Sequence, residues 1–235
     1  MIRIDFQQVA VERFGIRALD GITFTFDSSQ MPSVALLGSN GAGKSTLLGA
    51  VLGLCPITSG RILVDDLEVT RHSLSAVRKR VGMIFQNSDD QLFSQTVLED
   101  VTFGPNNLRL PPEEVRLRVE QTLERMGIAQ LAQREITRLS GGEKRRVALA
   151  GVLAMNPEAV FLDEPTSMLD PRGCRSLASC LNSLPILKVM ATHDLEFARQ
   201  VCGHAVVLNR GRIHAVGPID SILRDAPLLE ECGLK

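Results

Sequence analysis

The sequence predicts an α/β fold in which parallel strands present a binding site at their carboxyl ends. Residues 34–37 are an apolar run followed by a glycine-rich turn and a second apolar segment, which is the order strand, turn, helix. Residues 159–162 are a further apolar run typical of a buried parallel strand, residues 186–191 are predicted as another strand, and polar residues follow each of them directly. Because the carboxyl ends of parallel strands meet at one edge of a sheet, we expect these polar residues to lie together.

The turn after the first of these strands matches G-x-x-x-x-G-K-[ST], the phosphate-binding loop. Glycines lack a Cβ, so the backbone can wrap closely around a phosphate, and the new helix offers its N–H groups. Lys44 is expected to bridge the β- and γ-phosphates, and the Ser45 hydroxyl to bind Mg²⁺. An ordinary strand-to-helix turn is the alternative. The whole turn reads Gly38-Ser39-Asn40-Gly41-Ala42-Gly43-Lys44-Ser45, followed by Thr46.

Composition limits the classes of protein that the sequence allows. The chain has 235 residues, 44% of them hydrophobic, which is enough for one large domain with a core. No apolar run approaches the roughly 20 residues of a membrane span, and the N-terminus alternates like a strand rather than a signal peptide. A formal net charge of −1 argues against nucleic-acid binding. Neither the five cysteines nor the four histidines have the spacing of a metal site. The scattered cysteines indicate reduced thiols in a cytosolic protein.

Strands are predicted around the loop, and helices in the middle of the chain. A helix beginning at Thr96 is expected to end at Gly104-Pro105, and another opens at Pro111. We expect one domain, residues 1–235, with an α/β core (1–87 and 156–235) and an inserted helical subdomain (88–155). The remaining elements are strands 2–10, 21–27, 81–85 and one within 56–70; helices 73–80, 171–183 and 195–201; a hairpin of 205–208 and 212–216; and a short helix near Ser221.

Two polar or aromatic candidates lie outside these runs. Phe14 lies in the loop between the first two strands, and the chain has no Trp or Tyr, so stacking on adenine falls to Phe. An ordinary half-buried loop residue is the equal alternative for Phe14. Gln86 ends the strand 81–85, where its amide can reach a metal ion and the attacking water, or can simply cap the turn.

Leu139-Ser140-Gly141-Gly142-Glu143 opens an Ala/Leu-rich helix and is a second candidate anion site. A helix N-terminus with a hydroxyl group offers free donors to a phosphate. A simple N-cap is the alternative, but a cap does not need two glycines, so phosphate contact is favoured.

Two carboxylates follow the apolar strand 159–162 directly. Buried charges are costly unless they are used, so Asp163 is expected to join the magnesium shell and Glu164 to polarise the attacking water. His193 follows the strand 186–191 in the same way. A lone histidine is commonly structural, but this position favours contact with the γ-phosphate.

Taken together, these motifs resemble the ATP-binding-cassette (ABC) ATPases over nearly the full chain. The resemblance implies a P-loop NTPase core with a parallel sheet, an N-terminal antiparallel β subdomain and an inserted helical subdomain, with ATP and Mg²⁺ as cofactors. Met168 departs from the family, because Gly is usual before Leu-Asp. The motifs that carry the resemblance are the phosphate loop, Gln86, Leu139 to Glu143, Asp163-Glu164, Asp170 and His193.

A narrower resemblance covers Gln86-Asn87-Ser88-Asp89-Asp90-Gln91-Leu92-Phe93 and the residues from Val97 to Pro105. It is to the ATPases of energy-coupling-factor importers, those for cobalt or nickel most of all, then biotin or other vitamins. It implies a peripheral protein at the cytoplasmic face of the cell membrane. Its partners would be a membrane scaffold (T) subunit and a membrane substrate-binding subunit. The substrate-binding subunit would determine which substrate is transported.

Two other classes of ABC protein are alternatives to an importer ATPase. A soluble cassette acting on DNA or ribosomes would carry a coiled-coil insertion or a second cassette, and neither is present. An export or lipoprotein-release ATPase is disfavoured by residues 89–93 alone.

We expect Leu92 and Phe93 to contact the membrane partner, unless they pack inside the helical subdomain. Ser140 is expected to serve a partner's nucleotide in a head-to-tail homodimer, or in a heterodimer with a related ATPase.

Overall fold

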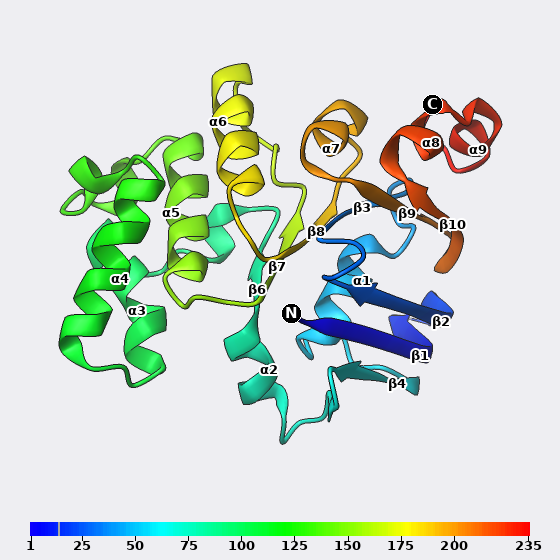
Figure 1. Ribbon diagram of the computed structural model, residues 1–235, viewed down its shortest axis with the longest axis horizontal. Helices are drawn as coiled ribbons and strands as arrows, with labels where there is room; N and C mark the ends of the chain where they lie inside the picture. Colours follow the sequence, from blue (N-terminus) through cyan, green and yellow to red (C-terminus); the bar gives the residue numbers. More distant parts are fainter. Residues whose placement is uncertain (14) are drawn as a thin grey trace.

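The computed structural model describes residues 1–13 and 15–235. Phe14, the candidate for adenine stacking, lies outside the described residues. Elements are labelled as in Figure 1, where the antiparallel strands and the long helical region lie on opposite sides of a central sheet.

The N-terminal strands form an antiparallel sheet. Ile4 of β1 lies opposite Phe26 of β2 and Val64 of β4, and these side chains are buried. Because side chains alternate between the faces of a strand, this register turns one apolar face toward the rest of the protein. The sheet order is β2-β1-β4-β5, with β1 (Arg3–Arg13), β2 (Ile16–Asp27), β4 (Ser59–Val64) and β5 (Leu67–Glu68).

The central sheet is parallel except for one edge strand. Its final strand pairs antiparallel with its neighbour, as the predicted hairpin requires. Each remaining pair of neighbours is parallel, which brings the carboxyl ends of those strands to one edge. The order is β10 (Arg212–Pro218), β9 (His204–Asn209), β3 (Ser33–Leu37), β8 (Leu187–Ala191), β7 (Ala159–Asp163), β6 (Val81–Ile84).

Both faces of the central sheet are covered, which explains the continuous apolar runs of its strands. Val34 and Leu36 of β3 join a core with the antiparallel sheet and helix α1, whereas Ala35 and Leu37 join a second core with the helical region. The covering helices include α1 (Lys44–Val51), α2 (Leu74–Arg80), α6 (Pro171–Asn182) and α7 (Leu195–Val201), with α8 (Ile219–Arg224) and α9 (Ala226–Glu231) at the C-terminal end.

Helices α3 (Val97–Asn107), α4 (Pro112–Arg125) and α5 (Gly141–Leu153) lie together at the opposite end from α8 and α9 (Figure 1). The single-turn helices η1 (Ser88–Asp90), η2 (Ala129–Leu131) and η3 (Ile136–Arg138) connect them to one another and to β6. Helix α3 begins with the predicted threonine cap, because the Thr96 hydroxyl accepts the Glu99 N–H and the Glu99 carboxylate accepts the Thr96 N–H.

The prediction that Gly104-Pro105 ends this helix is wrong. Helix α3 continues to Asn107, and the Leu108 N–H still donates to the Gly104 carbonyl. Proline removes one backbone hydrogen bond inside the helix, and packing offsets that loss. A Cβ on Gly104 would lie 2.7 Å from Met155 Cγ, so the glycine lets α3 approach the end of α5 closely. Tertiary contact has therefore overridden the local breaker signal.

Candidate active site

The glycine-rich loop joins β3 to α1, as predicted. Gly38, Gly41 and Gly43 have φ angles of +154°, +81° and +105°. A Cβ on Gly38 would lie 2.4 Å from the Leu208 carbonyl oxygen, and one on Gly43 would lie 2.6 Å from the Ala18 carbonyl oxygen. Glycine is thus required at these two positions by backbone conformation and by the neighbouring strands β9 and β2, as well as by any phosphate that the loop receives.

Lys44 is the first residue of α1, and its side chain turns back into the loop. The residue is 7% exposed, and its Nζ donates to the Gly38 carbonyl at 2.7 Å and to the Ser39 carbonyl at 3.1 Å. Burial lowers the pKa of Lys44, and the charges of Glu164 and Asp163 oppose that change. The ammonium is therefore held where an incoming phosphate would give its charge a further partner.

Asp163 ends the buried strand β7 beside the loop. Its carboxylate accepts a hydrogen bond from Ser45. Burial raises the pKa of Asp163 and the Glu164 charge adds to that effect, whereas the Ser45 bond and the Lys44 charge act in the opposite direction. A carboxylate and a hydroxyl from separate elements thus meet beside the phosphate loop.

Glu164, 8% exposed, is held by the last residue of strand β8 and by the two residues that follow it. Its N–H donates to the Ala191 carbonyl at 2.8 Å. Its Oε2 accepts the Thr192 hydroxyl at 3.1 Å and lies 2.9 Å from His193 Nδ1. The backbone of Glu164 has φ +44°, a strained value for a non-glycine residue of the kind that clusters at functional sites.

Gln86 follows strand β6, which pairs with the strand that precedes Glu164. Ile84 of β6 lies opposite Leu162 of β7, so Gln86 and Glu164 each follow two residues later on neighbouring parallel strands. The structure therefore gathers the predicted residues of three strand ends. We call Lys44, Ser45, Gln86, Asp163, Glu164 and His193 the sheet-edge site.

Sequence reasoning missed Thr192 and Arg145. Thr192 is fully buried and also accepts the Asp194 N–H at 3.0 Å, so it fixes the turn that carries His193. Its signal was its place directly after the strand. Arg145, 3% exposed, donates to the backbone carbonyls of Phe85 and Gln86 and, at 3.4 Å, to that of Glu164. Its spacing of four from the buried Leu149 was the available signal.

Residues Leu139 to Glu143, which we call the signature turn, lie apart from the sheet-edge site. Ser140 caps α5: its Oγ accepts the Glu143 N–H at 3.3 Å and donates to Glu143 Oε2 at 2.8 Å. The Ser140 N–H donates to the same carboxylate oxygen at 2.7 Å. This capping box corresponds to the N-cap that the sequence analysis gave as the alternative to phosphate contact. Gly141, the first residue of the helix, is exposed.

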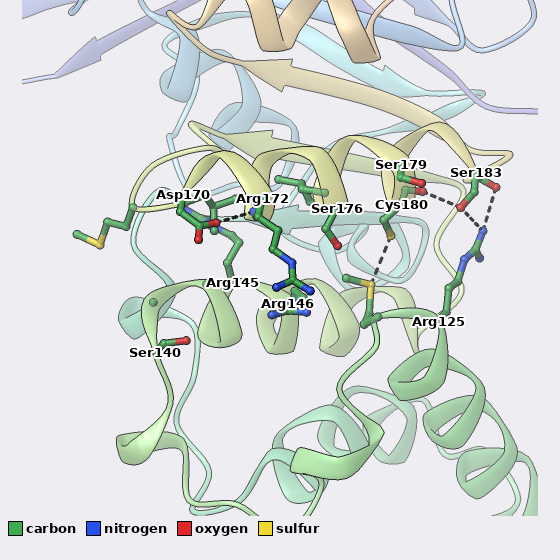
Figure 2. A pocket seen from close by; sticks show the side chains of 17 residues that line it. Arg125, Ser140, Arg145, Arg146, Asp170, Arg172, Ser176, Ser179, Cys180 and Ser183 are labelled. Carbon is green, nitrogen blue, oxygen red and sulfur yellow. Dashed lines mark hydrogen bonds between the residues drawn. The ribbon is translucent and has the colours of Figure 1, made fainter.

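The signature turn instead faces the residues before α6. Ser140, Gly141 and Gly142 line a groove of about 910 Å³ together with Met168 and Asp170. Figure 2 shows Ser140 at the start of α5 and Asp170 at the start of α6 on either side of it. The phosphate-loop residues, all of them described, are absent from the lining of this groove.

Asp170 and Met168 are both explained by backbone geometry. The Asp170 side chain accepts the Gly173 N–H at 2.6 Å and caps α6. Met168 is 82% exposed with φ +63°, in the left-handed region. The glycine that is usual here in the resembling family would adopt this conformation without strain, so Met168 keeps the turn at a conformational cost.

Comparison with models of known protein families identifies the family of this chain. A family model described as ABC transporter matches residues 19–167, more than half of the chain and the loop, turn and carboxylates described above.

The chain belongs to the ABC transporter family.

Curated relatives match almost the whole of this ABC ATPase. A putative ABC transporter ATP-binding protein of Geobacter sulfurreducens is 47% identical over 94% of the chain and 88% of its own length. An energy-coupling factor transporter ATP-binding protein of Methanoculleus marisnigri is 41% identical over 95% of the chain and 82% of its own length.

Solved structures agree with the fold. CbiO1 from Clostridium perfringens, part of the ABC transporter complex CbiONQ, superposes with a TM-score of 0.85 at 35% identity, covering 99% of this chain and 94% of CbiO1. A dimeric ATP-binding cassette in a post-hydrolysis state with ADP and Pi has a TM-score of 0.81 at 26% identity, covering 92% of this chain and 98% of that one. The predicted fold class is confirmed, and the chain is an ATP-hydrolysing transporter subunit.

Two further observations bear on the predicted contact with a membrane partner. Among the helices in the described part of the chain, not one has both the length and the apolar character to cross a bilayer. In the loop after Gln86, Leu92 is half-buried against the helical core, whereas Phe93 is 65% exposed and packs edge-on against Phe103 at 4.7 Å between ring centroids. The two residues that the sequence paired as anchors therefore differ in exposure.

Proposed function

We propose that the chain is the ATPase subunit of an energy-coupling-factor importer, bound peripherally at the cytoplasmic face of the cell membrane. The gathering of Lys44, Asp163, Glu164 and His193 at one sheet edge carries the proposal. A phosphate loop with two adjacent carboxylates is suited to the transfer of a phosphoryl group to water. Relatives that bear the name energy-coupling factor transporter ATP-binding protein support the importer type.

In this proposal each residue of the sheet-edge site has one task. Lys44 and the N–H groups of residues 38–46 bind the phosphates, and Glu164 takes a proton from the attacking water. His193 contacts the γ-phosphate from a position fixed by Glu164. The oxygen donors of Ser45, Asp163 and Gln86 are of the hard type that Mg²⁺ prefers, and the bond between Ser45 and Asp163 places two of them together. Bound Mg²⁺ would neutralise developing phosphate charge.

The signature turn is proposed to complete the site of a second subunit. Ser140, Gly141, Gly142 and Asp170 line a groove that the chain's own phosphate loop does not line, and together with Glu143, which holds Ser140, they form the proposed contact surface for a partner's nucleotide. A two-fold axis then makes two equivalent sites, in a homodimer or with a related ATPase. Residues 1–87 and 156–235 form the nucleotide-binding core of this unit, and residues 88–155 the helical subdomain.

Mixed dimers test the shared site. Lys44→Ala loses the phosphate-binding charge and Ser140→Arg blocks the signature turn, so each homodimer should be inactive. A mixed dimer contains one site in which wild-type Lys44 faces wild-type Ser140, and its hydrolysis should reach at most about half the wild-type rate, the statistical limit for one of two equivalent sites. Activity is measured as phosphate release from dimers isolated through two different tags.

A crosslink interprets an inactive mixed dimer. The exposed Asn40 and Gly141 are replaced by cysteine in separate tagged chains, and disulfide formation with ATP is followed on gels. A bond between chains supports the composite site and indicates that both sites must fire together. In a further variant with both substitutions in one chain, a crosslink that forms only within single chains would contradict the composite site.

The exposed Phe93 and Phe103 are proposed as the contact with the membrane scaffold. They border a small groove lined by Leu92, Ala148 and Val152 between α3 and α5, and aromatic side chains in such positions are typical interface anchors. Phe93→Ser should abolish co-purification with the scaffold while leaving the ATPase folded. Leu117→Ser, at an exposed apolar residue on α4, is the control and should have no effect. Retained complex and transport in Phe93→Ser would rule out this contact.

A transition metal ion, cobalt or nickel, is the proposed cargo, and a vitamin such as biotin is the second candidate. The pattern of residues 86–93 supports the metal, because it resembles the importers for cobalt or nickel more than those for vitamins. The test is to purify the ATPase with its native membrane partners, reconstitute them in vesicles and measure ATP-dependent uptake of ⁵⁷Co²⁺, ⁶³Ni²⁺ and labelled biotin. Uptake of biotin alone would overturn the metal assignment.

A further inference from the structure

We infer that Arg145 is a positioning residue that ties the helix of the signature turn to Gln86 and Glu164. The inference rests on the proposed roles of those two residues in hydrolysis. Arg145 lies on α5, five residues after Ser140, and its side chain leaves α5 toward the segment before α6 (Figure 2). One buried guanidinium thus belongs to the helix that begins at the signature turn and reaches the backbone of the sheet-edge site.

The hydrogen bonds of Arg145 all go to backbone carbonyls at strand ends. Its Nη1 donates to Phe85, and its Nη2 donates to Gln86 at 2.5 Å and to Glu164 at 3.4 Å. Phe85 and Gln86 follow β6, and Glu164 follows β7. A planar fork with donors on both arms fits several carbonyls at once, whereas a lysine ammonium would act as a point charge.

The burial of Arg145 requires a strong reason. It is 3% exposed, no carboxylate is within salt-bridge distance in the described structure, and its Nε is buried without a hydrogen-bond partner. Burial lowers the pKa of Arg145, and only the charge of Asp163 opposes this. A buried cation is costly unless hydrogen bonds compensate its lost hydration, and here the compensating acceptors include the backbone carbonyls of the proposed metal ligand and base.

This arrangement gives the two halves of the molecule a physical link. A shift of α5, such as contact at Ser140 with a partner's nucleotide would produce, moves Arg145 and with it the carbonyls of Gln86 and Glu164. Since Glu164 already has a strained backbone at φ +44°, a small displacement there changes where its carboxylate points. Arg145 therefore acts through these residues and does not contact the reacting atoms.

Arg145→Met removes every donor at nearly constant length, and Arg145→Lys retains one charged donor. We expect kcat for ATP hydrolysis to fall by about 10–100-fold in Arg145→Met, the size typical of a misplaced catalytic group, and by less in Arg145→Lys. KM and the equilibrium affinity for ATP should change by less than about threefold, because Lys44 and the loop are untouched. Hydrogen exchange should accelerate at residues 85–88 and 164–167 in both variants.

Arg118→Gln is the matched control. Arg118 is a half-buried arginine of the helical region that also donates to a backbone carbonyl, that of Met155 at 3.4 Å, away from the sheet-edge site. This variant should keep wild-type kcat and wild-type exchange at residues 85–88. If Arg145→Met does not fold, the same measurements on Arg145→Lys test the positioning role of Arg145.

The outcomes separate this inference from the proposed function. Wild-type kcat in a folded Arg145 variant, or a loss of ATP affinity as large as the loss of kcat, would overturn the positioning role. If Glu164→Gln is inactive and the Arg145 variants are fully active, only this inference fails. If Glu164→Gln hydrolyses ATP normally, the assignment of the base fails first.

Discussion

The sheet-edge site and the signature turn are built in opposite ways. Lys44 and Glu164 are buried, and both side chains are held before any nucleotide arrives: Lys44 by carbonyls of its own loop, and Glu164 by Thr192 at the end of another strand. Ser140 and Gly141 are exposed, and the bonds of Ser140 to Glu143 stay within the same turn. The difference teaches that, in the composite site proposed above, one half is preorganised within the chain, whereas the other half is an exposed surface available to a second molecule.

The largest expected effect comes from breaking the buried half. Glu164→Gln should reduce ATP hydrolysis by about 10²–10⁴-fold, because an amide still accepts the Thr192 hydroxyl but cannot take a proton from water. Equilibrium ATP binding should remain. Phosphate release and nucleotide binding are measured on the same preparation, and turnover near wild type would refute the role of Glu164 as the base.

Glu143→Gln is the counterpart on the signature turn. Glutamine can accept the same hydrogen bonds from Ser140 and so retains the capping box. This variant is expected to lose less than about tenfold in hydrolysis, since a cap at a helix start contributes only about 1 kcal/mol. A loss as large as that of Glu164→Gln would show that the two regions do not differ as described.

A pH series tests whether the buried half carries an electrostatic cost. Burial lowers the pKa of Lys44 below its ordinary 10.5, so the unfolded chain holds the proton more strongly than the folded one. The contribution of Lys44 to the free energy of unfolding therefore decreases as pH falls and increases as pH rises toward 10.5. The nucleotide-free wild type should gain stability relative to Lys44→Met between pH 7 and 10 in urea unfolding. A pH-independent difference between the two proteins would contradict this.

The smallest expected effect comes from the exposed half. Met168→Gly should relieve left-handed strain but increase the entropy of the unfolded chain, for a net gain of about 1 kcal/mol or less. Arg109→Gly, at φ +57° after α3, is the control and should give a similar gain. Thermal unfolding should show both variants shifted upward by about 2–4 °C at most. A loss of stability in Met168→Gly alone would mean that the Met168 side chain packs on something.

The sequence by itself determined the elements whose signals are local. The spacing of glycines and Lys44 marks the phosphate loop, apolar runs mark the buried strands, and Thr96 and Ser140 mark helix starts. It also placed Asp163, Glu164 and His193 at strand ends, and a parallel sheet necessarily brings such ends to one edge. These predictions succeeded because each depends on neighbouring residues or on a general rule of sheet geometry.

Only the tertiary structure decided the contacts between distant segments. Pro105 stays inside a helix because Gly104 packs against Met155, which lies about 50 residues away in the chain. Arg145 turns inward to carbonyls of Gln86 and Glu164, although its sequence context is a run of three basic residues. No local pattern encodes such pairings, because their free energy arises from burial and hydrogen bonds that exist only once the chain has folded.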